Sequence, residues 1–275
     1  MSSRPSSTVH PTRVSRRSLL SAATLLLGPS LAQASVRSAA ASPSSGLSPS
    51  FPTQDPDVVR EMVGASHVNI ARVKELVGRQ QTLAKASHDW GFGDWESALG
   101  AASHVGNREI AEFLLANGAR PSIFSAAMLG QLDVVKAFVT ASPGVQRIKG
   151  PHSITLLRHA MAGGAQAKPV VEYLTALGGA DERLPDQPTT AEDRAKLTGS
   201  YAFGSGTDER LEVTIVRDAL QIGRPGRFAR GLIHLGAFEF CPVGAENVKI
   251  RFSESAAGIT LTVHDPDVVF SARKA

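Results

Sequence analysis

The sequence predicts an α + β protein whose helices and strands lie in separate domains, a helical array of about four helix pairs followed by a small antiparallel β barrel or sandwich. Helical periodicity runs from Asp55 to about Gly179, with apolar residues three or four positions apart. From Leu197 onward apolar and polar residues alternate, which is typical of strands with one buried face. The 275 residues leave room for one or two domains with cores of their own.

The first 34 residues predict an export signal. Arg16 and Arg17 precede an apolar stretch, 19–27, and residues 32–34 (A-Q-A) supply a small-x-small cleavage pattern. The stretch is too short to span a bilayer as a permanent helix. The S-R-R-x-L-L motif resembles a twin-arginine signal, and an ordinary secretory signal is the alternative. Either interpretation predicts a periplasmic or secreted protein that is not integral to the membrane after cleavage.

Composition sets the remaining boundaries and the charge. Residues 35–54 are rich in Ser, Ala and Pro, as expected of a flexible linker, and a proline-rich stretch follows the helical pattern. The predicted domains are 1–34 (signal), 35–54 (linker), 55–183 (helical repeats), 184–196 (linker) and 197–275 (β domain). The chain holds 29 Lys and Arg against 25 Asp and Glu, and four of those arginines lie in residues 1–34, which contain no acidic residue. The rest is therefore neutral, and we expect no nucleic-acid partner.

Internal repeats organise the helical part. Residues 65–68 (A-S-H-V) recur as residues 102–105, and related copies begin near Ala126 and Ala160. In each copy a helix of small residues ends at Gly or Asn, and an amphipathic helix follows. One such pair cannot bury its own apolar face, so several pairs are expected to stack into a solenoid.

The second repeat carries a family resemblance. Residues 106–119 (G-N-R-E-I-A-E-F-L-L-A-N-G-A) follow the ankyrin pattern G-x-x-E-I-V-x-x-L-L-x-x-G-A, and a weaker likeness extends over residues 55–183. Gly100 stands where that family usually has a histidine. The resemblance implies a surface, built from loop tips and first helices, that binds another protein.

The C-terminal part predicts short strands in which apolar residues face inward. The inward positions are expected at Leu211, Val213, Ile215, Leu220, Ile222, Val248, Ile250, Phe252, Ile259, Leu261 and Val263. Glycine-rich turns separate these runs, which suits a small barrel or sandwich. Cys241 is the only cysteine, so it forms no internal disulfide and is expected to be a small buried apolar residue.

An aromatic segment lies between the first two repeats. Trp90, Phe92 and Trp95 fall within six residues and include both tryptophans of the chain. Such residues often dominate protein interfaces, so we predict partner binding by these three side chains and His152. The favoured alternative is that the aromatic side chains fold back as a cap over the end of the first repeat, which otherwise exposes apolar surface.

No catalytic motif is present in the sequence, which lacks G-x-S-x-G, H-E-x-x-H, a phosphate-binding glycine loop and C-x-x-C. Stacking is expected to bring His104, His152 and His159 to one side, and Asp89 and Asp94 are the available carboxylates nearby. Hydrogen bonds that stabilise the stack are the favoured role of these histidines, so we predict no metal and no cofactor.

The sequence therefore predicts an exported interaction module that is not an enzyme and that binds a protein partner through its ankyrin-like surface. One alternative is a β barrel that holds a small apolar ligand in a cavity lined by phenylalanines, with the helices as an accessory domain. That lining would comprise Phe203, Phe228, Phe238, Phe240 and Phe252. The second alternative is an enzyme with a site between the two domains.

Overall fold

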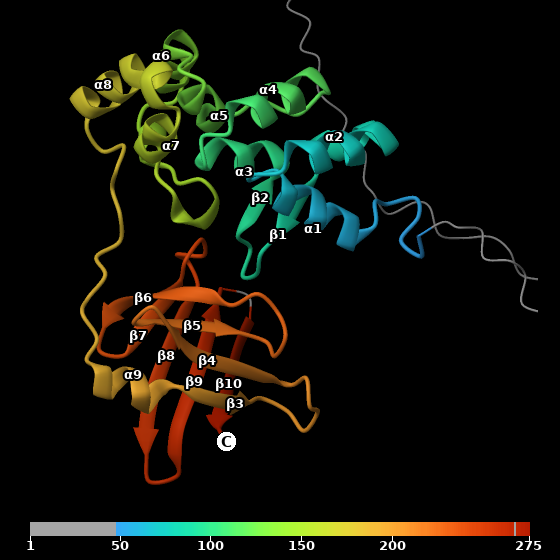
Figure 1. Ribbon diagram of the computed structural model, residues 1–275. Helices are drawn as coiled ribbons and strands as arrows, with labels where there is room; N and C mark the ends of the chain where they lie inside the picture. The colour runs from blue at the N-terminus through green and yellow to red at the C-terminus, as the bar shows by residue number, and fades with distance from the viewer. Residues whose placement is uncertain (1–47, 267) are drawn as a thin grey trace, which may run out of the picture. The chain divides into compact units, whose positions relative to one another are not determined.

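The structure, a computed structural model, describes residues 48–266 and 268–275. Helices in its N-terminal part precede a closed antiparallel barrel in its C-terminal part, which confirms the α + β prediction and selects the barrel over the sandwich (Figure 1). Arg16, Arg17 and most of the predicted linker 35–54 lie outside the described residues. Within the described residues, no helix is both long and apolar enough to cross a membrane.

The helices follow one another as pairs. Their bounds are α1 Pro56–Ala65, α2 Ile70–Arg79, α3 Ala98–His104, α4 Arg108–Ala116, α5 Ile123–Met128, α6 Leu132–Ala141, α7 Leu156–Ala162 and α8 Lys168–Leu177. Short 3-10 turns connect them: η1 Gln81–Lys85, η2 Val145–Arg147, η3 Pro151–Ser153 and η4 Gly164–Ala167. The first helices pack in the order α1, α3, α5 and α7, while α2 packs on α4 and α6 on α8.

Small residues allow the first helices to approach closely. Ala101, Ala102, Ala126 and Ala127 of α3 and α5 are almost fully buried, and alanine adds little bulk between neighbouring helix axes. Larger apolar side chains from both helices of a pair fill the space around them, such as Leu99 of α3 and Ile110 and Leu114 of α4, which are at most 2% exposed. The repeated sequence pattern thus produces two core clusters, one around α1 to α4 and one around α5 to α8.

The turn between the helices of a pair requires glycine. Gly106 and Gly130 have φ values of 76° and 74° and follow α3 and α5, a conformation that only glycine adopts without strain. The residue after each glycine then donates its backbone N–H to a carbonyl five residues earlier. Asn107 donates to Ala102 at 2.8 Å, and Gln131 donates to Ala126 at 2.9 Å. A Cβ atom on Gly106 would also overlap the carbonyl oxygen of Ala162.

A β hairpin separates the first two helix pairs. Its strands are β1 Ser87–Asp89 and β2 Trp95–Ser97, and the register places His88 opposite Glu96. Gly91 and Gly93 have positive φ at its tip. The hairpin therefore positions Glu96 at the start of α3, whose N-terminal cap is the next residue, Ser97.

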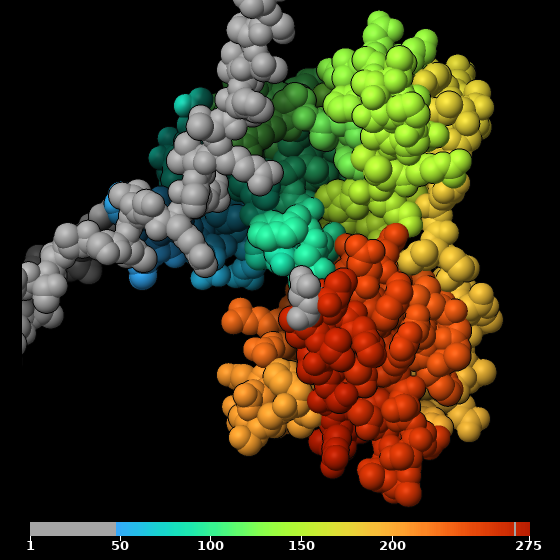
Figure 2. Space-filling view, turned by 180° about the vertical axis from the view of Figure 1, so that it is seen from behind, coloured from blue at the N-terminus to red at the C-terminus, as the bar shows by residue number. Residues whose placement is uncertain are grey.

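The barrel is an up-and-down meander of antiparallel strands. Its strands are β3 Gly199–Ala202, β4 Arg210–Val216, β5 Ala219–Gly223, β6 Arg230–Gly236, β7 Glu239–Pro242, β8 Lys249–Ser255, β9 Gly258–Asp265 and β10 Val268–Lys274. Each strand pairs with the next, and β10 pairs with β3 to close the barrel. In Figure 2 the segments β8 to β10, coloured in reds, form one continuous face.

Side chains fill the barrel interior. Tyr201, Ile222, Phe240 and Ile250 are at most 1% exposed, and Phe252 packs with them in one core cluster. Phe240 and Phe252 are thus core residues rather than the walls of an open interior cavity. Cys241 is buried, as predicted.

Two details differ from the sequence prediction. Ile215, expected to face inward, is 42% exposed because it lies near the end of β4, where the β4–β5 hairpin leaves the core. Helix α9 (Ala191–Leu197) occupies the second half of the stretch 184–196 that was expected to be a linker. Its Leu197 is buried in the barrel core, and the Leu197 carbonyl accepts a hydrogen bond from the Tyr201 hydroxyl at 2.7 Å.

Candidate metal centre

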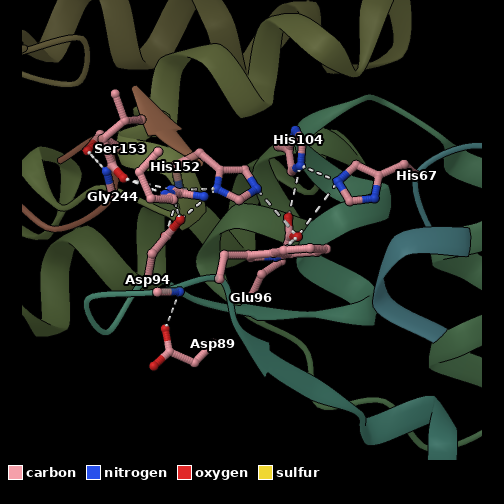
Figure 3. Close-up of polar contacts among 12 residues, drawn as sticks. His67, Asp89, Asp94, Glu96, His104, His152, Ser153 and Gly244 are labelled. Atoms are coloured by element: carbon pink, nitrogen blue, oxygen red, sulfur yellow. Dashed lines mark hydrogen bonds and ion pairs between the residues drawn. The ribbon is translucent and has the colours of Figure 1, made fainter. Parts of the chain in front are cut away.

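Three histidines and one glutamate converge within the helical part. His67, Glu96, His104 and His152 each offer a ligand atom, and these atoms all lie within 4.8 Å of one another. Figure 3 shows the three imidazole rings directed toward the carboxylate of Glu96. We call these four residues the His₃Glu cluster.

The repeat places two of the histidines together. His67 follows α1 and His104 ends α3, so they occupy equivalent positions in the first two units. Because α1 packs on α3, their rings meet edge to face with centroids 4.9 Å apart. Their Nε2 atoms are 3.1 Å apart.

Glu96 supplies the negative charge at the centre of the cluster. Its side chain is fully buried, with Oε2 accepting the indole N–H of Trp90 at 2.7 Å. Oε1 lies 2.9 Å from Nε2 of His104 but has no partner with hydrogen-bond geometry. Burial opposes ionisation of this carboxyl group, yet contacts with His104 and His152 outweigh it and lower the pKa to about 2. The carboxylate is therefore ionised although it is buried, and a buried negative charge favours a neighbouring cation.

His152 is held in place by its backbone as well as its ring. It adopts a left-handed conformation with φ of 60° in η3, which is uncommon for a residue with a side chain. Asp94 stabilises this geometry by accepting the backbone N–H at 2.9 Å and Nδ1–H at 2.7 Å. Nε2 then lies 3.4 Å from Oε2 of Glu96. Burial opposes protonation of His152, but Asp94 and Glu96 outweigh it and raise the pKa of the ring to about 9.

The atom separations suit a tetrahedral ion. Ligand atoms bound to zinc at about 2.0–2.1 Å lie roughly 3.3–3.4 Å from one another in a tetrahedron. The cluster's separations are 3.1 Å between the His67 and His104 nitrogens, 2.9 Å from His104 to Oε1 of Glu96, and 3.4 Å and 3.7 Å from His152 and His67 to its Oε2. One ligand atom from each residue lies within 4.8 Å of the others, so rotations of these side chains would bring the four atoms to the tetrahedral edge.

Outer hydrogen bonds orient two of the rings. Nδ1 of His67 contacts the Gly64 carbonyl oxygen at 3.0 Å, and Nδ1 of His152 contacts Asp94. A ring that donates from Nδ1 presents the Nε2 lone pair once it is neutral, so a metal ion bound at His152 would displace the proton that its raised pKa favours. Metal-binding histidines are commonly held in this way by a carbonyl or carboxylate.

Asp94 also contacts the barrel part of the chain. Its carboxylate pairs with the guanidinium group of Arg230 in β6, which is only 4% exposed. Burial lowers the pKa of Arg230, while Asp94 opposes that change. The pKa of Asp94 is lowered, since its contacts with His152 and Arg230 outweigh the effect of burial. Nearby, the Gly244 N–H donates to Oγ of Ser153 at 2.8 Å (Figure 3).

Two residues considered from the sequence lie outside the ligand set. His159 is buried, its Nδ1 contacts the Thr155 carbonyl oxygen at 2.9 Å, and burial lowers its pKa to about 4. Its ring centroid is 6.4 Å from that of His104, so it packs behind the cluster. Asp89 accepts the Gly91 N–H at 2.8 Å and stabilises the hairpin tip.

The residues predicted to bind a partner have different surroundings. Trp90 is bonded to Glu96 and packs against the helical core, and His152 belongs to the His₃Glu cluster. Phe92 has a φ of 59° and packs against the barrel core. Trp95 is 63% exposed and is the only one of the four that leaves most of its side chain free.

Sequence reasoning anticipated the proximity of His104 and His152 but not the whole cluster. The equivalent positions of His67 and His104 could have indicated a pair, because stacking aligns equivalent residues. Glu96 was missed, although alternation along the hairpin could have placed it opposite His88. The left-handed backbone of His152 has no signal in the sequence.

Comparisons with protein-family models, with curated proteins and with solved structures found no match. No relative therefore assigns a role to any residue of the cluster. Its function is inferred from its own geometry and charge.

Proposed function

We propose that this protein binds one divalent first-row metal ion, with Zn²⁺ the best fit, at His67, Glu96, His104 and His152. The supporting observation is the convergence of three imidazole nitrogens on a buried carboxylate whose Oε1 has no hydrogen-bond partner. Imidazole and carboxylate ligands in a four-coordinate set are suited to zinc. This proposal replaces the sequence-based expectation of purely structural histidines.

The ion's proposed role is structural. Four protein side chains would close a tetrahedral shell, whereas catalytic zinc sites keep one position for water or substrate. The ligands come from the turn after α1, from β2, from the end of α3 and from η3. One ion would therefore fix the hairpin and three helical segments against one another.

The test is zinc titration by isothermal calorimetry of the full chain after chelator treatment. We expect one ion per chain, and Glu96→Gln should weaken binding by at least about 10-fold, since even outer-shell changes cost that much. The double variant His67→Ala/His104→Ala should lose the site. His264→Gln, which changes a histidine outside the cluster, is the matched control.

Circular dichroism of each variant separates loss of the site from loss of the fold. Unchanged zinc affinity in the folded double variant would reject the proposed ligands. Absence of zinc binding by the wild-type chain would reject the function.

A second candidate function is protein binding by an exported ankyrin-type solenoid. The order of first-helix packing supports that fold, and Trp95 offers an exposed aromatic side chain beside the cluster. A partner captured by the wild type and lost with Trp95→Ala, but retained by Phe138→Ala, would support this function. Equal capture by both variants would place the binding surface elsewhere.

A further inference from the structure

A second site is suggested by a pocket at one end of the barrel. It has a volume of about 440 Å³, within the usual range for small-molecule sites. Its apolar lining comes from the hairpin tip and the barrel and includes Trp90, Phe92, Phe203, Ile222, Phe228 and Phe270. Because the barrel interior is filled, a ligand would occupy this end rather than the centre.

One wall residue is unusually exposed. Phe228 is 64% exposed although its ring lies 5.4 Å, centroid to centroid, from that of Trp90. Burying an exposed aromatic side chain of this size is favourable. An apolar ligand in the pocket would cover it.

Arginines give the pocket its charge. Arg224 and Arg227 line it and are exposed, and neither has an ion-pair partner among the described residues. The guanidinium group of Arg224 lies over the Phe203 ring, 5.3 Å from its centroid. Arg230 is the third arginine of the lining and is already paired with Asp94. Within the described chain, no acidic residue lines this pocket.

We propose that this pocket binds a monocarboxylate with an extended apolar body. The phenylalanines and Trp90 would contact the apolar body, and Arg224 and Arg227 would bind the carboxylate by charge-assisted hydrogen bonds. Recognition of this ligand does not depend on the His₃Glu cluster. Trp90 is shared by the two sites, because its ring lines the pocket and its indole N–H donates to Glu96.

The test uses a charge series with one alkyl chain: dodecanoate, dodecanol and dodecyltrimethylammonium, each below its micelle concentration. The protein is the full chain carrying Trp95→Phe, which leaves Trp90 as the only tryptophan and therefore as a fluorescence reporter in the pocket. We expect saturable binding of dodecanoate and at least 10-fold weaker binding of the ammonium compound. The alcohol should lie between them.

Two variants separate the charge from the apolar wall. Arg224→Gln/Arg227→Gln should weaken dodecanoate binding about 10-fold and leave dodecanol unchanged. The matched control Arg120→Gln/Arg217→Gln alters exposed arginines outside the lining and should change neither. Phe228→Ala should weaken both ligands.

Equal binding of the carboxylate and the ammonium compound, or an unaffected Arg224/Arg227 variant, would overturn the proposal. The titration is repeated with and without zinc, so that a failure of dodecanoate binding can be distinguished from a failure of metal binding.

Discussion

Asp94 joins the His₃Glu cluster to the barrel through one carboxylate. It accepts two hydrogen bonds from His152 and pairs with Arg230, and it is only 3% exposed. The His152 backbone is strained, so this conformation persists only where such contacts hold it. Asp94 therefore acts as a positioning residue for the proposed ligand His152.

Asp94→Asn tests that role. The amide retains the shape but removes the negative charge, leaving the buried Arg230 without its counter-ion, so we expect a lower melting temperature. Zinc affinity should fall by about 10- to 100-fold, as for other outer-shell changes. Calorimetry and thermal unfolding measure the two effects, with the exposed Asp208→Asn as control. A folded variant with wild-type zinc affinity would remove Asp94 from the site.

At the scale of single elements, helix α6 lacks the side-chain cap that α2 and α4 have. Asn69 and Asn107 cap α2 and α4 by accepting the N–H of the residue three positions on, at 3.0 Å and 3.2 Å. Gln131 holds the same position before α6 and makes no such bond. Its φ and ψ of −79° and 73° are close to those of Asn107 at −79° and 84°.

We therefore expect Gln131→Asn to stabilise the protein by about 1 kcal/mol, the typical value of an asparagine cap. Urea unfolding of the two proteins measures the difference in free energy. Gln131→Ala is the control, since alanine cannot accept the helix N–H, and it should give no gain. Equal stability of the Asn and Ala variants would contradict the capping argument.

Much of the element pattern could be predicted from the sequence, because periodicity records which residues face a core. It predicted helices through Gly179 and alternating strands after Leu197. It did not predict α9, because the sequence A-E-D-R-A-K-L has a single large apolar residue. It also did not predict the exposure of Ile215, because alternation does not show where a strand leaves the barrel. Glu96 and the backbone of His152 depend on contacts between segments distant in sequence, which periodicity does not encode.

At the scale of the whole molecule, the His₃Glu cluster connects parts of the chain that otherwise contact mainly their neighbours. The stability of stacked helix pairs is approximately a sum over pairs and the interfaces between adjacent pairs. The four ligands span the chain from His67 to His152 and thus add a connection across several units. Without the ion, only contacts between neighbouring units offset the entropic cost of ordering these segments.

Zinc should accordingly raise the stability of the folded chain. An ion that binds only the folded state at a free concentration 100 times its Kd stabilises it by about 2.7 kcal/mol. For a protein of this size each kcal/mol raises Tm by roughly 2–4 °C. Thermal unfolding followed by circular dichroism at increasing zinc, with chelator added at the end, measures the shift and its reversal.

Two comparisons make that shift specific. Magnesium prefers oxygen ligands in octahedral geometry, so it should leave Tm unchanged at the same concentration. Glu96→Gln should abolish most of the zinc effect, because it removes the one anionic ligand of the cluster. An equal zinc-dependent rise in the Tm of that variant would show that the ion acts elsewhere on the chain. The connection between the first units and η3 would then depend on protein contacts alone.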